Sequence, residues 1–269
     1  HMPRAPGRVA ARFGAPRGKL MQAPEDVENI PGTWHPNTMA THLLSHGTGR
    51  PADTRPGLCL APDATDDAPF LAATRMHEAC GPARRSFAVW LAGRLTGPVI
   101  WIRPTWSADR LHAPGIADFA EPARFVFIAP GRKDDLLWCA EEALRTGAAP
   151  LVVADLPEPP PLTPVRRLHL AAAAGGEALS ALRKGAPRST PRAMRGAPAD
   201  LPGPLGLLLC PGEGGAQGIE TRWHMAPAHT DALSCTWTLE RRRARALPPR
   251  RWTVHQTMPG ESPVLRPSN

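Results

Sequence analysis

The residues with the clearest chemical meaning lie where a predicted strand passes into a predicted helix, a position typical of the phosphate-binding loop G-x-x-x-x-G-K-[ST]. They are Ala79, Cys80, Gly81, Pro82, Ala83, Arg84, Arg85 and Ser86. Aligned on the final hydroxyl, Ala79 and Arg84 take the two glycine places and Arg85 replaces the lysine. Such a loop wraps phosphate with backbone N–H groups in positive-φ conformations, which favour glycine. We therefore predict a degenerate loop without ATP hydrolysis, and weak anion binding at the helix N-terminus stays open.

Asp155 ends the apolar run that begins at Leu151, as the Walker B aspartate of a nucleotide hydrolase would. In that role it would hold magnesium, and ATP with magnesium stays the alternative to a chain without a cofactor. The other interpretation is a carboxylate that caps a helix or orders a loop. Glu78, beside the loop, could be a former catalytic base, but nothing in the sequence requires it.

The sequence gives no support for a metal site, a catalytic nucleophile or a membrane-spanning segment. His42 and His46 stand four residues apart without a third ligand, and the five cysteines never form a Cys-x-x-Cys pair. No Gly-x-Ser-x-Gly motif is present. No apolar run reaches the roughly 18 residues that span a bilayer. These absences predict a protein of the cytoplasm without a metal site.

Arginine clusters and a formal net charge of +8 suit a polyanion or an acidic protein partner. One cluster holds Arg183, Lys184, Arg188, Arg192 and Arg195. A second, the candidate DNA or partner surface, holds Arg241, Arg242, Arg243, Arg245, Arg250, Arg251 and Trp252. Arginine and tryptophan together grip single strands through phosphates and stacked bases. Solvated loops are the alternative, and for Trp223, Trp237 and Trp252 we favour a core role.

The elements that would position these residues alternate between strands and helices. Strands are expected at Met76–Cys80, Pro98–Arg103, Arg124–Ala129, Pro150–Asp155, Leu205–Cys210, Ile219–Pro227, Ser234–Glu240 and Trp252–Gln256. Helices are expected at Arg84–Thr96, Ala108–Ala120, Lys133–Thr146 and Thr163–Ala174. This alternation predicts an α/β fold with a mostly parallel sheet flanked by helices and a C-terminal antiparallel extension.

The chain divides by composition into an extension, a core and a tail. Residues 1–70 are predicted to be an irregular, proline-rich basic extension, within which Met39 is an alternative start. Residues 71–256 form the core, with a basic, disordered insertion at 183–204. A disordered tail is expected over 257–269.

Several segments of the core resemble ImuA, the RecA-like protein of bacterial mutagenesis cassettes. They are Met76–Phe87, Asp135–Gly147, Pro150–Pro157, Arg166–Ala171, Gly214–Trp223 and Leu239–Trp252. The resemblance implies a RecA-like, P-loop type of fold, with Ala79–Ser86 at the phosphate-loop position and Asp155 at the Walker B position. It also places Gly214, Gly215 and Gln217 near the DNA-binding loops of RecA-type proteins.

The resemblance further implies a role in SOS-induced, error-prone translesion synthesis. ImuA proteins act beside ImuB, RecA and an error-prone DnaE-type polymerase, so these are the expected partners. The expected function is that of a non-catalytic adaptor. Two alternatives remain: an active ATPase that remodels RecA filaments on single-stranded DNA, and a stand-alone DNA-binding protein.

Overall fold

The computed structural model describes residues 56–61, 68–185, 201–228, 235–245 and 247–268, all within one unit of the chain. Its strands are β1 (Gly57–Cys59), β2 (Phe70–Ala72), β3 (Met76–Cys80), β4 (Val99–Ile102), β5 (Phe125–Ile128), β6 (Leu151–Asp155), β7 (Leu205–Leu209), β8 (Arg222–Pro227), β9 (Cys235–Arg243), β10 (Arg250–Gln256) and β11 (Val264–Pro267). Its helices are α1 (Arg84–Gly93), α2 (Ala113–Ala117), α3 (Lys133–Thr146) and α4 (Leu162–Gly185), with a 3₁₀ turn at Pro122–Arg124.

Nine strands make one sheet in the order β11-β10-β9-β8-β3-β7-β6-β4-β5. From β8 to β5 all neighbours are parallel, whereas β8, β9, β10 and β11 pair antiparallel. The strands β3, β6 and β7 are buried along their whole length, which explains the nearly continuous apolar sequence of β6 and β7, whereas β3 also buries His77 and Glu78. The expected mixed α/β fold, with its mostly parallel sheet and antiparallel extension, is confirmed.

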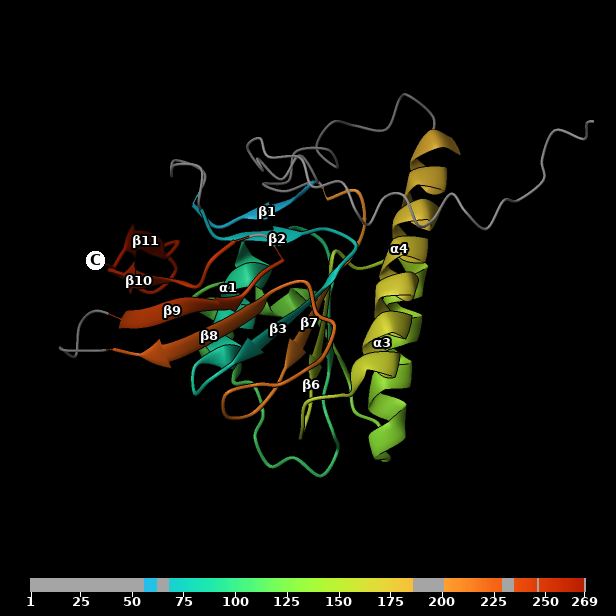
Figure 1. Ribbon diagram of the computed structural model, residues 1–269, viewed down its shortest axis with the longest axis horizontal. Coiled ribbons are helices and arrows are strands. Elements are labelled where there is room, and N and C mark those ends of the chain that lie inside the picture. The colour runs from blue at the N-terminus through green and yellow to red at the C-terminus, as the bar shows by residue number, and fades with distance from the viewer. Residues whose placement is uncertain (1–55, 62–67, 186–200, 229–234, 246, 269) are drawn as a thin grey trace, which may run out of the picture. The chain divides into compact units, whose positions relative to one another are not determined.

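Helices cover the two faces of the parallel strands and make two cores. On one face α1 buries Phe87, Trp90 and Leu91 against the sheet. On the other face α3 and α4 lie side by side, with Leu144 and Val165 among their buried residues (Figure 1). Because side chains alternate along each strand, a single strand such as β6 feeds both cores. This arrangement holds the carboxyl ends of the parallel strands at one edge.

Helix α4 is longer than the sequence predicts. We expected it to end at Ala174, but it continues through Gly175 and Gly176 to Gly185. A Cβ on Gly175 would lie 2.0 Å from the Leu144 carbonyl oxygen, so glycine is needed there for the close approach of α4 to α3. The start of the predicted disordered insertion is therefore helical, and its residues 186–200 lie outside the described part of the chain.

Three further expectations need correction or fall outside the structure. The predicted tail is wrong at Val264–Pro267, which adds β11 to the sheet by pairing with β10. Strands β1 and β2 pair with each other inside the segment expected to be irregular, whereas residues 1–55 and Met39 lie outside the described residues. Helix α2 covers only five residues of the predicted Ala108–Ala120 helix. None of the described helices is long and apolar enough to span a membrane.

A single arginine closes the C-terminal end of α1. The Arg124 side chain donates from Nε to the Gly97 carbonyl at 2.7 Å, from Nη1 to Ala92 at 3.0 Å and from Nη2 to Leu95 at 2.6 Å. Ala92 lies in the last turn of the helix, and Leu95 and Gly97 follow it, so these carbonyls stand where intrahelical donors run out. Burial lowers the pKa of this guanidinium, although the nearby Glu121 carboxylate opposes that effect.

We expect Arg124→Ala to lower the free energy of unfolding by about 2 kcal/mol, because three carbonyl groups lose a charged donor. Chemical denaturation of the two proteins measures the difference. Arg132→Ala, at an exposed position before α3, is the matched control and should leave stability nearly unchanged. Equal stability of the Arg124 variant and the control would contradict this role.

Candidate functional site

The degenerate loop lies where the sequence places it, between a strand and a helix at the carboxyl edge of the sheet. Ala79 and Cys80 end β3, and Arg84, Arg85 and Ser86 begin α1, so only three residues connect the two elements. Burial raises the pKa of the Cys80 thiol to about 11, and the Glu78 carboxylate adds to the rise. At neutral pH this thiol is protonated and is therefore no nucleophile.

The backbone N–H groups of the loop are bonded within the protein. Gly81 N–H donates to the Gly212 carbonyl at 2.9 Å, and Ala83 N–H donates to Met225 at 3.0 Å. Arg84 N–H turns back to Gly81 at 3.3 Å, and Pro82 has no N–H. The positive φ of Gly81 (+86°) lets the chain approach β8, since a Cβ there would lie 2.6 Å from the Met225 carbonyl oxygen. Gly81–Ala83 therefore forms no ring of free donors for a phosphate.

An ion pair joins Arg85, predicted at the lysine position of a phosphate loop, to Asp155, predicted at the Walker B position. Arg85 Nε donates to Asp155 Oδ2 at 2.6 Å, and Arg85 Nη1 donates to Asp109 Oδ2 at 3.0 Å. Asp155 is only 6% exposed, so its charge needs a close partner. Burial lowers the pKa of the Arg85 guanidinium, but the hydrogen bond and charge of Asp155, followed by those of Asp109, raise it overall. Arg85 and Asp155 thus neutralise each other's charge.

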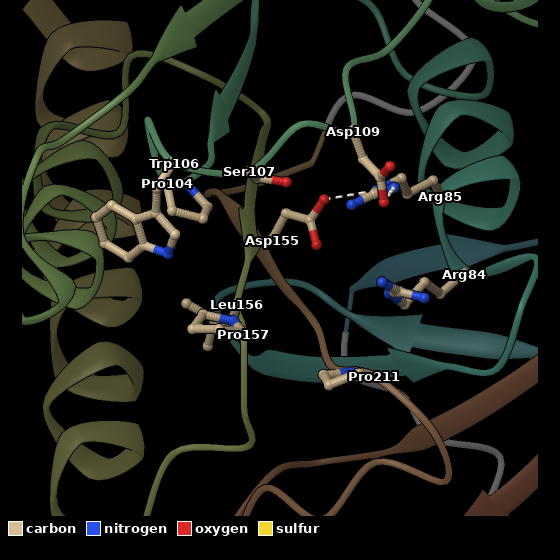
Figure 2. Close-up of a pocket in the computed structure, with 10 residues that line it drawn as sticks. All are labelled: Arg84, Arg85, Pro104, Trp106, Ser107, Asp109, Asp155, Leu156, Pro157 and Pro211. Carbon is tan, nitrogen blue, oxygen red and sulfur yellow. Dashed lines mark hydrogen bonds and ion pairs between the residues drawn. The ribbon is translucent and has the colours of Figure 1, made fainter.

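A pocket of about 240 Å³ opens between these residues, as Figure 2 shows. Arg84, Arg85, Ser107, Asp109 and Asp155 form its polar side. Its apolar side consists of Pro104, Trp106, Leu156, Pro157 and Pro211. These residues follow β4, β6 and β7 or begin α1, so the pocket lies at the crevice where open α/β sheets bind ligands.

Sequence reasoning missed the contribution of the segment after β4. Trp106, Ser107 and Asp109 fall in or next to the segment that we expected to be a helix. They lie in an irregular stretch between β4 and α2. The available signal was their place directly after a buried strand, because the carboxyl ends of parallel strands meet at one edge.

The glycine-rich loop Gly212–Gly218 is held by a buried carboxylate. Glu78 Oε1 accepts hydrogen bonds from the N–H groups of Gly215 at 2.7 Å and Ala216 at 3.0 Å. Glu78 Oε2 accepts one from Arg222 Nε at 2.5 Å. Glu78 is fully buried and paired, which does not suit a catalytic base.

Three loop residues were expected to lie near DNA, and two of them, Gly214 and Gly215, contribute to the loop through their backbone. Gly214 has a φ of +74°, and a Cβ there would lie 2.7 Å from Glu78 Oε1. Gly215 is exposed and donates to the same oxygen. Gln217 is exposed, so its side chain is the one that can reach a partner.

The second arginine cluster divides into inward and outward members. Arg241 is 1% exposed, donates to the Pro248 carbonyl at 2.9 Å and lies 5.3 Å above the Trp252 ring. Trp252 is 3% exposed, as expected for a core residue, and Trp223 and Trp237 are buried too. The prediction that Arg241 and Trp252 belong to a contact surface is therefore wrong, because the alternation of β9 and β10 turns both side chains inward.

The other arginines of this cluster lie nearer to solvent, and most have partners. Arg242 pairs with Glu213 and Glu240, and Arg251 pairs with Glu240 at 2.5 Å. Arg245 lies 3.5 Å from Glu220, and Arg250 lies 5.6 Å from the Trp252 ring. Arg243 is exposed at the end of β9. Among residues of the first cluster, Arg188, Arg192 and Arg195 lie outside the described residues, and so does the side chain of Arg183.

Residues of the described segments form no group of three or more histidine, cysteine or acidic side chains that could hold a metal ion. The candidate site therefore consists of a closed loop, an internal ion pair and a small pocket.

Comparison with known proteins gives little further guidance. No family model matches the chain, and no curated protein matches it. Among solved structures, the crystal structure of SulA from Pseudomonas aeruginosa is similar to it, with 15% sequence identity and a TM-score of 0.35. The match covers 51% of this chain and 98% of SulA. At this identity and TM-score, the likeness carries no argument about function.

We expect Glu78→Gln to loosen the glycine-rich loop, because Arg222 would then face an amide in place of a carboxylate. Breaking a buried ion pair by removing one charge costs about 3 kcal/mol. Hydrogen exchange should show faster exchange at the amides of Gly215 and Ala216 than in the unmodified protein. Glu261→Gln, at an exposed position, is the control. Unchanged protection of both amides would show that Glu78 does not hold the loop.

Proposed function

We propose that the chain is a non-catalytic adaptor of SOS-induced, error-prone translesion synthesis, with a RecA-like fold whose nucleotide site is replaced by an internal ion pair. The observation that carries the non-catalytic part is the Arg85–Asp155 contact of 2.6 Å at the carboxyl edge of the sheet. The segments that resemble ImuA support the process and the partners, which are ImuB, RecA and the DnaE-type polymerase.

The placement of the two residues supports a P-loop ancestry. In P-loop nucleotide hydrolases, the loop lysine and the Walker B aspartate flank the phosphates and the magnesium ion. Here the residue at the lysine place lies in the first turn of α1, after β3, and the aspartate ends β6. Strand β7 lies between β3 and β6, so both side chains reach the same edge of the sheet. A RecA-like sheet with a disabled loop accounts for this arrangement.

The rival function, an ATPase that remodels RecA filaments, has two features in its favour, Ser86 and Asp155. Against it, Asp155 Oδ2 already accepts a hydrogen bond from Arg85, and the N–H groups of Gly81 and Ala83 are bonded to neighbouring strands and loops. A nucleotide would have to break these contacts before its phosphates were bound. The adaptor function needs no such change.

We expect titration with MgATP by calorimetry to give no saturable heat at micromolar concentrations. The reason is that the loop has no free N–H groups in Gly81–Ala83 and its basic side chain is engaged. The Arg85→Glu variant serves as the control for heat unrelated to this site. Saturable heat that is lost in Arg85→Glu would instead establish a working nucleotide site and overturn the non-catalytic proposal.

We expect purified ImuB to be captured by the chain. Charge reversal at the two outward arginines, Arg243→Glu with Arg251→Glu, should weaken capture about threefold to tenfold, because charges at the rim of an interface mainly affect association. Arg132→Glu, exposed at the start of α3, is the matched control. If the unmodified chain captures no ImuB, the proposed role in translesion synthesis is wrong.

A further inference from the structure

One cation in the pocket is left without a partner of opposite charge. Arg84 extends into the pocket from the first turn of α1, opposite Leu156 and Pro157 (Figure 2). Its Nη1 donates to the Gly81 carbonyl at 3.3 Å, while its Nε is buried without a hydrogen-bond partner. Among the described residues, no acidic side chain forms an ion pair with it. A buried donor without an acceptor costs about 1–3 kcal/mol, so the Arg84 guanidinium is incompletely satisfied within the chain.

The charges in the pocket are unevenly paired. Arg84 and Arg85 are positive, and Asp109 and Asp155 are negative, so the four side chains are neutral together. Both carboxylates contact Arg85, at 3.0 and 2.6 Å, and neither forms an ion pair with Arg84. A nucleoside triphosphate, with several negative charges, would meet the Asp109 and Asp155 carboxylates. One carboxylate on the Arg84 side would pair the cation that has no ionic partner in the described residues.

The N-terminal turn of α1 adds to the attraction. Its N-cap residue, Ala83, makes no capping hydrogen bond, and no acidic residue occupies the first turn. The positive end of the helix dipole therefore faces the same side of the pocket as Arg84, and a carboxylate there gains from both.

The size and opposite wall of the pocket fit amino-acid side chains. Sites for drug-sized ligands have roughly 300–1,000 Å³, whereas this pocket has about 240 Å³. Trp106 is 52% exposed, so its ring offers an apolar contact that no described residue covers fully. Aromatic side chains commonly line the grooves that receive extended peptides. The space therefore suits an acidic side chain with an adjacent apolar one.

We propose that this pocket receives an acidic side chain and a neighbouring aliphatic side chain from a partner protein, with Arg84 as the ion-pair partner and Trp106 as the packing surface. The inference rests on the proposed adaptor function and assigns to it a docking site. The site that bound phosphate in a P-loop protein would thus bind a protein carboxylate in this one.

The test uses the full chain and three probes. The peptide acetyl-Ala-Leu-Glu-Leu-Ala-amide supplies the acidic and aliphatic groups, its glutamine counterpart removes only the charge, and inorganic pyrophosphate represents phosphate chemistry. Binding is followed by NMR at the indole N–H of Trp106, which is assigned by its loss in Trp106→Phe. We expect the glutamate peptide to shift this signal and to bind at least tenfold more tightly than the glutamine peptide.

Variants locate the effect. Arg84→Gln should abolish the preference for glutamate over glutamine, whereas Arg132→Gln should retain it, with thermal unfolding confirming that both are folded. No shift at Trp106, equal binding of the two peptides, or tighter binding of pyrophosphate than of the glutamate peptide would each overturn the proposal.

Capture of ImuB separates this inference from the function on which it rests. If the unmodified chain captures ImuB and Arg84→Gln captures it equally well, the docking site is wrong while the adaptor function stands. If ImuB is not captured but the glutamate peptide binds at Arg84, the pocket is a carboxylate site and the proposed process is wrong. Weaker capture by Arg84→Gln, by tenfold or more, supports both.

Discussion

The Arg85–Asp155 ion pair determines what the carboxyl edge of this sheet can do. Asp155 ends a central strand with 6% of its surface exposed, and a buried carboxylate without a cation is strongly unfavourable. In a working phosphate loop, lysine and magnesium would meet that need. Here Arg85 meets it at 2.6 Å and also reaches Asp109. The pair joins α1, β6 and the segment after β4, so the edge is stabilised without any ligand.

Glu78 follows the same physical rule on β3, two strands from β6 in the sheet. It is fully buried on β3, and both of its carboxylate oxygens accept hydrogen bonds, from Arg222 and from two N–H groups of the glycine-rich loop. The N–H of Gly81, between β3 and α1, donates to the Gly212 carbonyl and so connects that turn to the same loop. In sites that bind nucleotide, backbone N–H groups and acidic residues at this edge face the ligand. In this protein they bond to one another.

The bounds of individual strands and helices were predictable from the sequence, whereas the contacts between them were only partly predictable. The bounds of α3 follow from helical spacing and match the structure, and the apolar run of β6 predicts that strand to within one residue. The meeting of Arg85 and Asp155 could have been derived, since parallel strands end at one edge. The burial of Arg241 could not, because it depends on the register between β8, β9 and β10. The predicted end of α4 at Ala174 was wrong, because Gly175 allows the close packing of α4 against α3 and Gly176 packs against Thr74 and Gly203.

The distribution of paired and unpaired arginines favours a protein partner over a polyanion. A nucleic-acid surface needs several cations spaced along one face, because affinity grows with the number of phosphates neutralised. Here Arg222, Arg242, Arg245 and Arg251 all lie within ion-pair distance of glutamates, and Arg241 faces the core. Pairing leaves separated single charges such as Arg84 and Arg243. Isolated charges set in apolar surroundings discriminate among protein surfaces, where one matched carboxylate fixes the register of a contact. Within the described part of the chain, this pairing supports the proposed adaptor over the alternative of a DNA-binding protein.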